Sequence, residues 1–433
     1  MNINKNLSKD LGELTVSDMS KLYAAKKYKE LTEIIPTILK KNPKDIEVLN
    51  ILALSYKQIG NSIKAEELFI QFLNMDIKDK FYHYVYSNAG NLFYDTGKVE
   101  KALSCHNFAL QLNPNNLNSL NQVGLCLSNK GDDKAAISYF KKALEIDHKE
   151  ASAHINLANS ARNLGLYKEA SDHYAFSDQP LAKCQEIECL YLLGDRDSFN
   201  KKLLEFSKLN KPHPLAASLS SHASIRYDQE DIFSFCNKPF EFVESSNLYD
   251  LKDFNDNLIK EFFNCLNSLK ISKKTQSLLK NGYQSSGNIF LIDLPPIQIL
   301  KNIVINKINN YRKKYNDGSA TFLSQWPEDY VLYGWIIVMD NGGNLSGHMH
   351  KEGWLSGSLY LERPEKNQEN DGDIIFSLHG SNYPREDKEF PFKIVDIDKG
   401  DMVLFPSSLF HATIPFNSNK KRITLAFDII PKV

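Results

Sequence analysis

The stretch Gly-His-Met-His at residues 347–350 decides how the C-terminal half of this chain folds. Residues i and i+2 of a strand point to the same side, so His348 and His350 can converge on one metal ion. A third histidine, His411, follows after a Gly-Asp turn and a strand, and it must come from another strand of the same closed sheet. Imidazole nitrogens suit Fe(II), and a facial set of three protein ligands leaves three coordination positions open. The spacing therefore predicts an iron site.

An arginine follows the third histidine at a distance that suits an anion anchor. Arg422 lies eleven residues after His411, where the next antiparallel strand can bring its guanidinium back beside the metal. A guanidinium presents a fixed fork of donors that matches a carboxylate. The alternative is a solvated charge, which is the expectation for the neighbouring Lys420 and Lys421. The order of the three histidines and the arginine favours the anchor.

Four runs carry a family resemblance, at residues 350–361, 399–407, 411–415 and 422–427. Together they resemble the 2-oxoglutarate/Fe(II)-dependent oxygenase superfamily, closest to an uncharacterised bacterial branch often found behind tetratricopeptide repeats. The resemblance covers residues 236–433. It implies that His411 is the distal metal ligand and that Arg422 and Thr424 hold the far carboxylate of 2-oxoglutarate. Tyr360 is similar in position to a tyrosine that often supports the same carboxylate.

The first ligands depart from the superfamily, in which His-x-Asp or His-x-Glu is usual. In one register His348, His350 and His411 form a three-histidine site, with one negative charge fewer on the iron. In the other register His350 and Glu352 restore the usual motif, and His348 lies outside the ligand set. The relatives favour the first register, and His350 and His411 are ligands in both.

Short runs rich in Val, Ile, Leu, Phe and Tyr, separated by glycine-containing turns, predict the strands of this half. They cover residues 335–340, 355–361, 373–378, 392–397, 402–405 and 423–430. The expected fold is a double-stranded β-helix, or jelly roll, buttressed by helices over residues 254–269 and 296–315. Trp335 is expected in the core, Trp354 either in the core or at a substrate pocket, and His379 in a loop.

The N-terminal half shows a period of thirty-four residues. Small residues recur in three columns, of which Gly90, Gly124 and Ala158 form the first. Phe140 shares an aromatic column with Tyr174, where the first repeat has a histidine. The pattern resembles tetratricopeptide repeats, in which small residues let two antiparallel helices pack closely. Such arrays stack into a superhelix whose concave face usually binds peptides or partner proteins. A set of asparagines near the first helices could bond such a peptide or simply be solvated: Asn88, Asn91, Asn118, Asn121, Asn156 and Asn159.

The expected organisation is an α + β chain of two domains. An α-solenoid of tetratricopeptide repeats covers residues 17–178, a degenerate helical cap and junction covers 179–235, and the oxygenase-like jelly roll covers 236–433. The junction is expected to end at the turn Asn237-Lys238-Pro239.

Composition favours a cytoplasmic protein. The formal net charge is −1 and no long basic run exists, so a nucleic-acid partner is not favoured. Residues 1–9 lack an apolar segment behind their lysines, and no long apolar run occurs, so neither secretion nor membrane insertion is expected. The six cysteines, none in Cys-x-x-Cys spacing, are expected to be buried thiols.

The resemblance implies an oxidoreductase, a dioxygenase that uses Fe(II), 2-oxoglutarate and O2. The first hypothesis is a hydroxylase whose repeats recruit a peptide or protein substrate or partner. Two alternatives remain: an oxygenase of a small molecule or glycan whose repeats serve only assembly, and a catalytically inactive, cupin-like binding protein.

Overall fold

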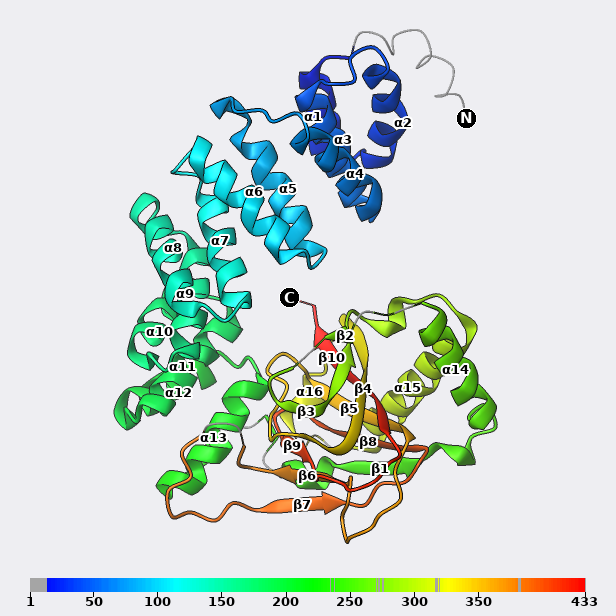
Figure 1. Ribbon diagram of the computed structural model, residues 1–433. Helices are drawn as coiled ribbons and strands as arrows, with labels where there is room; N and C mark the ends of the chain where they lie inside the picture. Colours follow the sequence, from blue (N-terminus) through cyan, green and yellow to red (C-terminus); the bar gives the residue numbers. More distant parts are fainter. Residues whose placement is uncertain are drawn as a thin grey trace. The chain divides into compact units, whose positions relative to one another are not determined.

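The computed structural model describes residues 14–432 except 234, 237, 270, 272, 275, 316, 317, 319, 381 and 382. Residues 1–9 and Asn237, on which two of the expectations above rest, lie outside the described residues. The chain divides into two compact units, Met1–Ser177 and Asp178–Val433 (Figure 1). Helices fill the first unit, and sheets with flanking helices form most of the second. The expected two-part α + β organisation is therefore confirmed.

The first unit is a series of helix pairs. The bounds are α1 (Val16–Ala24) with α2 (Tyr28–Leu39), α3 (Ile46–Gln58) with α4 (Ser62–Leu73), α5 (His83–Asp95) with α6 (Val99–Leu112), α7 (Leu117–Asn129) with α8 (Asp133–Ile146), and α9 (Ala151–Asn163) with α10 (Tyr167–Tyr174). Side chains cap several starts, as Asn116 does by accepting from the amide of Ser119. Such a bond satisfies one of the free amides of a first turn.

The small-residue column works by close approach between the helices of one pair. A Cβ atom on Gly124 would lie 2.3 Å from the ring of Phe140, and one on Gly90 would lie 2.5 Å from the ring of His106. His106 thus takes the place in its repeat that Phe140 takes in the next. The periodic small residues therefore mark the positions where a ring of the second helix packs against the backbone of the first helix.

The asparagines of the first helices mostly bond to the neighbouring repeat. Asn88 donates to the Asn50 side chain at 3.0 Å, and Asn118 donates to the Ser87 hydroxyl at 2.7 Å. Asn159 accepts from the Tyr174 hydroxyl at 2.6 Å. These asparagines therefore tie helices together, a role that neither of the two expectations included.

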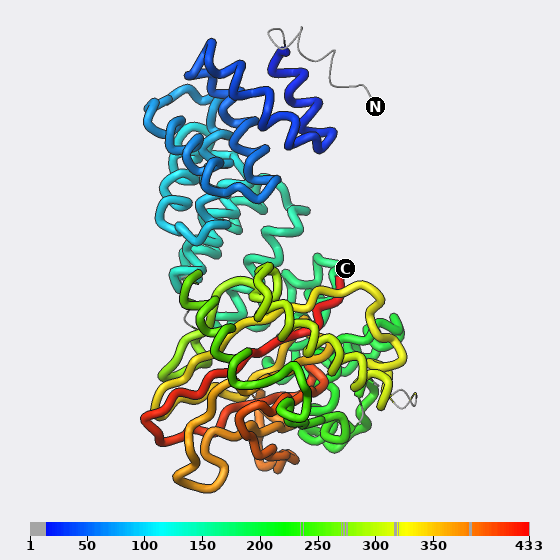
Figure 2. The backbone as a smooth tube through the Cα atoms, turned by 90° about the vertical axis from the view of Figure 1, so that its right-hand side faces the viewer, coloured from blue at the N-terminus to red at the C-terminus, as the bar shows by residue number. Residues whose placement is uncertain are grey.

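The second unit contains two antiparallel sheets. The larger has the strand order β1-β8-β5-β10-β4-β3-β2 and the smaller has β7-β6-β9. The bounds are β1 (Glu244–Asn247), β2 (Lys273–Lys274), β3 (Leu279–Ser285), β4 (Tyr330–Leu345), β5 (Leu355–Glu362), β6 (Ile374–Ser377), β7 (Phe392–Val395), β8 (Asp401–Pro406), β9 (Phe410–Thr413) and β10 (Arg422–Pro431). Figure 2 shows β10, in red, among the long strands of this unit. All six predicted strands exist, β9 is the further strand that was expected to carry His411, and β1, β2 and β3 are additional.

Helices flank these sheets. They are α11 (Pro180–Leu193), α12 (Arg196–Ser207), α13 (Pro214–Tyr227), α14 (Asp256–Ser268), α15 (Pro295–Lys314) and α16 (Thr321–Ser324). The segment 179–235, expected as a cap and junction, belongs to the second unit. Its side chains, such as Tyr191 and Leu219, share one buried apolar cluster with Phe427 of β10. Among the described residues, no helix combines the length and hydropathy that a membrane span requires.

Candidate metal centre

Strand β9 and the loop after β4 bring the three histidines together. The amide of His348 donates to the carbonyl of His411 at 3.1 Å, and the amide of His411 donates to the carbonyl of His348 at 2.8 Å. This reciprocal pair is an isolated antiparallel bridge outside the longer ladders. His350 follows two residues later in the same loop. One nitrogen from each of the three rings lies within 4.8 Å of the others.

The hydrogen bonds of the three rings point their free nitrogens at one another. His348 Nδ1 lies 2.9 Å from the carbonyl of Ser346, and His411 Nδ1 lies 3.3 Å from the carbonyl of Leu409. A carbonyl only accepts, so each Nδ1 carries the proton and each Nε2 offers a lone pair. His350 Nε2 lies 3.3 Å from His348 Nε2. Two lone pairs at this separation repel unless they share a cation, so the donor set fits a metal ion.

Burial keeps two of these imidazoles in the form that binds a metal. It lowers the pKa of His348 to about 4 and that of His411 well below its ordinary value, with the neighbouring histidines adding to both shifts. A metal ligand must be deprotonated, and a low pKa ensures this at neutral pH. Glu352, the ligand in the second register, is exposed and is not part of the group that could hold a metal.

Arg422 is buried in the same cavity without a carboxylate partner. It is 3% exposed, its Nε donates to the carbonyl of Gly372 at 3.0 Å, and its Nη1 donates to Thr424 Oγ1 at 3.0 Å. Burial lowers its pKa, and no carboxylate oxygen of the described residues lies within the 4.0 Å of an ion pair. A buried charge is costly unless paired. The site therefore calls for an anion.

Tyr360 adds a second unsatisfied group. The Arg422 guanidinium lies 4.8 Å from the centre of its ring, and the fully buried hydroxyl, which lies near Arg422 and Ser358, makes no hydrogen bond of good geometry with a described residue. Burial raises the pKa of this hydroxyl, so it stays protonated and can donate. The two groups together could bind a carboxylate, as the sequence led us to expect.

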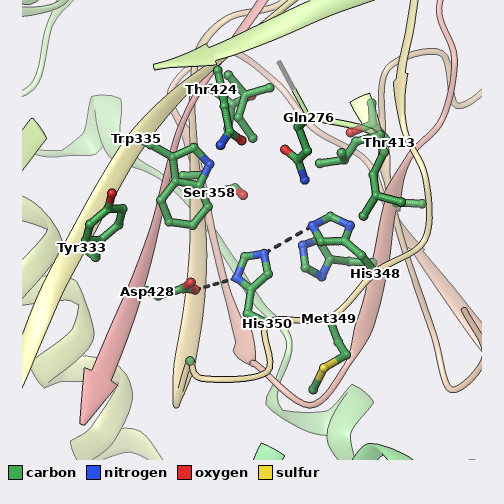
Figure 3. Close-up of a pocket in the computed structure, with 18 of the residues that line it drawn as sticks. Gln276, Tyr333, Trp335, His348, Met349, His350, Ser358, Thr413, Thr424 and Asp428 are labelled. Carbon is green, nitrogen blue, oxygen red and sulfur yellow. Dashed lines mark hydrogen bonds and ion pairs between the residues drawn. The ribbon is translucent and has the colours of Figure 1, made fainter. Parts of the chain in front are cut away.

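These groups line one cavity of about 660 Å³ between the two sheets. Alternate residues of β10 face it, and Figure 3 shows Trp335 of β4 near His350, with Tyr333 of the same strand next to Trp335. The Trp335 ring lies 5.6 Å from the His350 ring. Trp335 is half-buried and packs against an apolar cluster that includes Ile337 and Phe416, as expected, but it also lines the cavity. Trp354 lies in the core, 6% exposed, with its indole donating to the carbonyl of Phe322 at 2.6 Å. His379 does lie in a loop, beside His222.

Sequence reasoning missed four residues around this cavity. Asp428 lies 2.7 Å from His350 Nδ1, and Ser356 donates to the same carboxylate at 2.7 Å. The signal for Asp428 was present, because residues 422, 424 and 428 of one strand share a face. Leu181 and Gln185 of α11 also line the cavity, and no local pattern marked them.

Two family models match this chain, one in each of its two compact units. A family model described as "Putative 2OG-Fe(II) oxygenase" matches residues 333–428, and one described as "Tetratricopeptide repeat" matches residues 117–149. The chain is 29% identical over 160 residues to the peroxisomal targeting signal receptor of Kluyveromyces lactis, covering 37% of this chain and 25% of that protein. It is 23% identical over 385 residues to a TPR repeat-containing protein of Methanocaldococcus jannaschii, covering 75% of this chain and 66% of that protein.

Solved structures show similarity to part of the chain. MamA is 20% identical with a TM-score of 0.34, covering 38% of this chain and 93% of MamA. PilF of Pseudomonas aeruginosa is 18% identical with a TM-score of 0.39, covering 45% of this chain and 89% of PilF. The chain thus spans only a quarter of the yeast receptor but most of these two shorter structures. One polypeptide thus matches a tetratricopeptide repeat in its first unit and the family described as "Putative 2OG-Fe(II) oxygenase" in its second.

Proposed function

We propose that residues 178–433 form a 2-oxoglutarate- and Fe(II)-dependent dioxygenase, specifically a hydroxylase, on a jelly-roll scaffold. The observation that carries this proposal is the pairing, in one cavity, of three converging imidazoles with a buried guanidinium that lacks a carboxylate. The first group suits a divalent metal and the second suits a dianionic co-substrate. Neither group alone would distinguish an oxygenase from another metal site.

The chain's own residues bind and orient the reactants. His348, His350 and His411 would hold Fe(II), and with 2-oxoglutarate and O2 the metal supplies the oxidising chemistry. Arg422 and Thr424 would bind the far carboxylate of 2-oxoglutarate, with the Tyr360 hydroxyl donating to it. Apolar side chains that line the cavity, among them those of β4, limit the access of water.

Succinate formation tests the proposal. The purified full chain, with Fe(II), ascorbate and 2-oxoglutarate under air, should release succinate, and His411→Ala and Arg422→Ala should not. Lys420→Ala is the matched control, because this exposed lysine lies near the same strand and pairs with Glu365. Succinate formation that is unchanged in the His411 and Arg422 variants would overturn the proposal. A wild type that binds metal but forms no succinate would favour the inactive binding protein.

We propose further that the repeat unit recruits a peptide or protein substrate or partner. The similarity to peroxisomal targeting signal receptors supports this, since that name describes a receptor for a targeting signal. Removal of residues 1–177 should then abolish turnover of a protein substrate while leaving metal binding intact. The cut belongs after Ser177 because α11 lines the cavity. Full turnover by the shortened chain would instead support a small molecule or glycan as the substrate.

A further inference from the structure

Asp428 is a buried carboxylate whose surroundings single out one histidine. It is 7% exposed on β10 and faces the cavity. Its Oδ1 lies 2.7 Å from His350 Nδ1 and 2.7 Å from Ser356 Oγ. Among the described residues, no lysine or arginine pairs with it, and its close ring partner is the imidazole of His350. Figure 3 shows the contact between Asp428 and His350 as a dashed line.

The three imidazoles differ in the charge of their outer acceptors. His348 and His411 each donate from Nδ1 to a neutral backbone carbonyl, whereas His350 donates to a carboxylate. A charged acceptor holds the ring in one tautomer and raises the basicity of the opposite nitrogen, which faces the metal. Of the three histidines, only His350 is therefore hydrogen-bonded to a negatively charged group, the Asp428 carboxylate.

Two serines fix the carboxylate itself. Ser356 has a single hydroxyl hydrogen, which it donates to Asp428, so the hydroxyl of Ser407, 2.7 Å away, must donate to Ser356. Ser356 is fully buried, and so is Ser407. Each hydroxyl in this chain thus donates to the next group, from Ser407 to Ser356 and from Ser356 to Asp428. The carboxylate then also accepts the hydrogen bond from His350.

We propose that Asp428 is the positioning residue of the metal centre and supplies, through His350, the negative charge that a three-histidine ligand set lacks. The proposal rests on the proposed metal site and deepens it. It assigns the missing carboxylate to the last strand, one hydrogen bond outside the ligands, and not to Glu352. The centre would then bind a divalent cation, and Asp428, hydrogen-bonded to the ligand His350, would offset part of the cation's charge.

Cobalt binding by the full chain tests this inference without requiring turnover. Co(II) would be titrated into the wild type, Asp428→Asn, Ser356→Ala and His411→Ala, with the visible absorption of the bound ion as the readout. Asp428→Asn keeps the shape and removes the charge, and it should weaken binding by about 10- to 100-fold. Ser356→Ala keeps the charge and removes one donor, and it should weaken binding by less than about 10-fold. Thermal unfolding without metal reports separately on the fold.

The possible outcomes separate the two proposals. Cobalt binding in the wild type that His411→Ala abolishes supports the metal site, whatever the Asp428 variant does. If Asp428→Asn then binds within about twofold of the wild type, the positioning role is overturned and the metal site stands. If Asp428→Asn does not fold, Asp428→Ser, which also removes the charge, is titrated instead, and binding within about twofold of the wild type overturns the role. A wild type that binds no cobalt overturns both.

Discussion

Replacing Arg422 by methionine should separate ligand binding from folding stability. The guanidinium is buried without a carboxylate, which costs several kcal/mol of desolvation. Its bonds to Gly372 and Thr424 return about 1.5–3 kcal/mol each. These contributions nearly cancel, so we expect the free energy of unfolding of the ligand-free variant to stay within about 2 kcal/mol of the wild type. Methionine also fills most of the vacated space.

The response to 2-oxoglutarate should change far more. Two charge-assisted hydrogen bonds to a carboxylate contribute about 3–6 kcal/mol, so their loss weakens binding by about 10²- to 10⁴-fold. At a concentration one hundred times the wild-type Kd, 2-oxoglutarate stabilises the wild type by about 2.7 kcal/mol. The variant should gain at most about 0.4 kcal/mol at the same concentration. For a unit of this size the wild-type gain corresponds to roughly 5–11 °C in Tm.

Thermal unfolding of the full chain with Mn(II), with and without 2-oxoglutarate, measures both effects. Arg363→Met is the matched control, because the Arg363 side chain is 9% exposed and pairs with the fully buried Asp373 at 3.0 Å. Asp373 keeps Lys366 at 2.7 Å, so breaking the pair with Arg363 should cost about 1–3 kcal/mol and leave the response to 2-oxoglutarate intact. A loss of much more than about 2 kcal/mol of unfolding free energy in Arg422→Met, or an unchanged response to 2-oxoglutarate, would refute the reasoning.

Three further predictions concern stability. Burial lowers the pKa of His106 to about 4, so between about pH 6.5 and 4 only the unfolded chain binds this proton. The free energy of unfolding of the repeat unit should therefore fall by up to about 3 kcal/mol as the pH falls through this range. His106→Phe, which copies Phe140 of the next repeat, should flatten that slope in urea unfolding, and an unchanged slope would assign it elsewhere. Gly124→Ala places a Cβ against Phe140 and should cost the repeat unit about 1–3 kcal/mol by the same assay, unless the ring can move aside. Glu188→Gln removes the buried carboxylate that binds Lys351, next to His350, and should lower the free energy of unfolding of the second unit by about 1–3 kcal/mol. Glu186→Gln is the control: its partner Lys202 is 40% exposed, so the loss in thermal unfolding should be less than about 1 kcal/mol.

Much of the candidate site was predictable because strand geometry is local. Alternation predicted that His348 and His350 converge, and a Gly-Asp turn marked the approach to the strand that carries His411. The distance from His411 predicted that Arg422 returns beside the metal, whereas Thr424 followed only from the family resemblance. The same alternation extends to Asp428, which was overlooked because an acid inside an apolar strand gives no local sign of its partner. That partner, His350, is seventy-eight positions away in the sequence.

The errors arose where tertiary packing decides the outcome. Trp335 lies on β4 and Trp354 directly before β5, and only tertiary packing determines that Trp335 meets the cavity. The helices after Ser177 continue the helical pattern of the repeats, and periodicity alone does not reveal that Tyr191 packs into a sheet-based core. Strands β1 to β3 are short or contain polar and glycine residues, so no apolar run announced them.

The reciprocal backbone bond between His348 and His411 has a consequence for how metal enters the site. Two of the three candidate ligands are held at their final spacing by main-chain atoms that do not depend on an ion. Metal binding then requires little ordering of the chain, so metal-free molecules would already hold these two ligands in place. Emptying and refilling the centre should be rapid and repeatable, and the fraction of active molecules would follow the supply of metal.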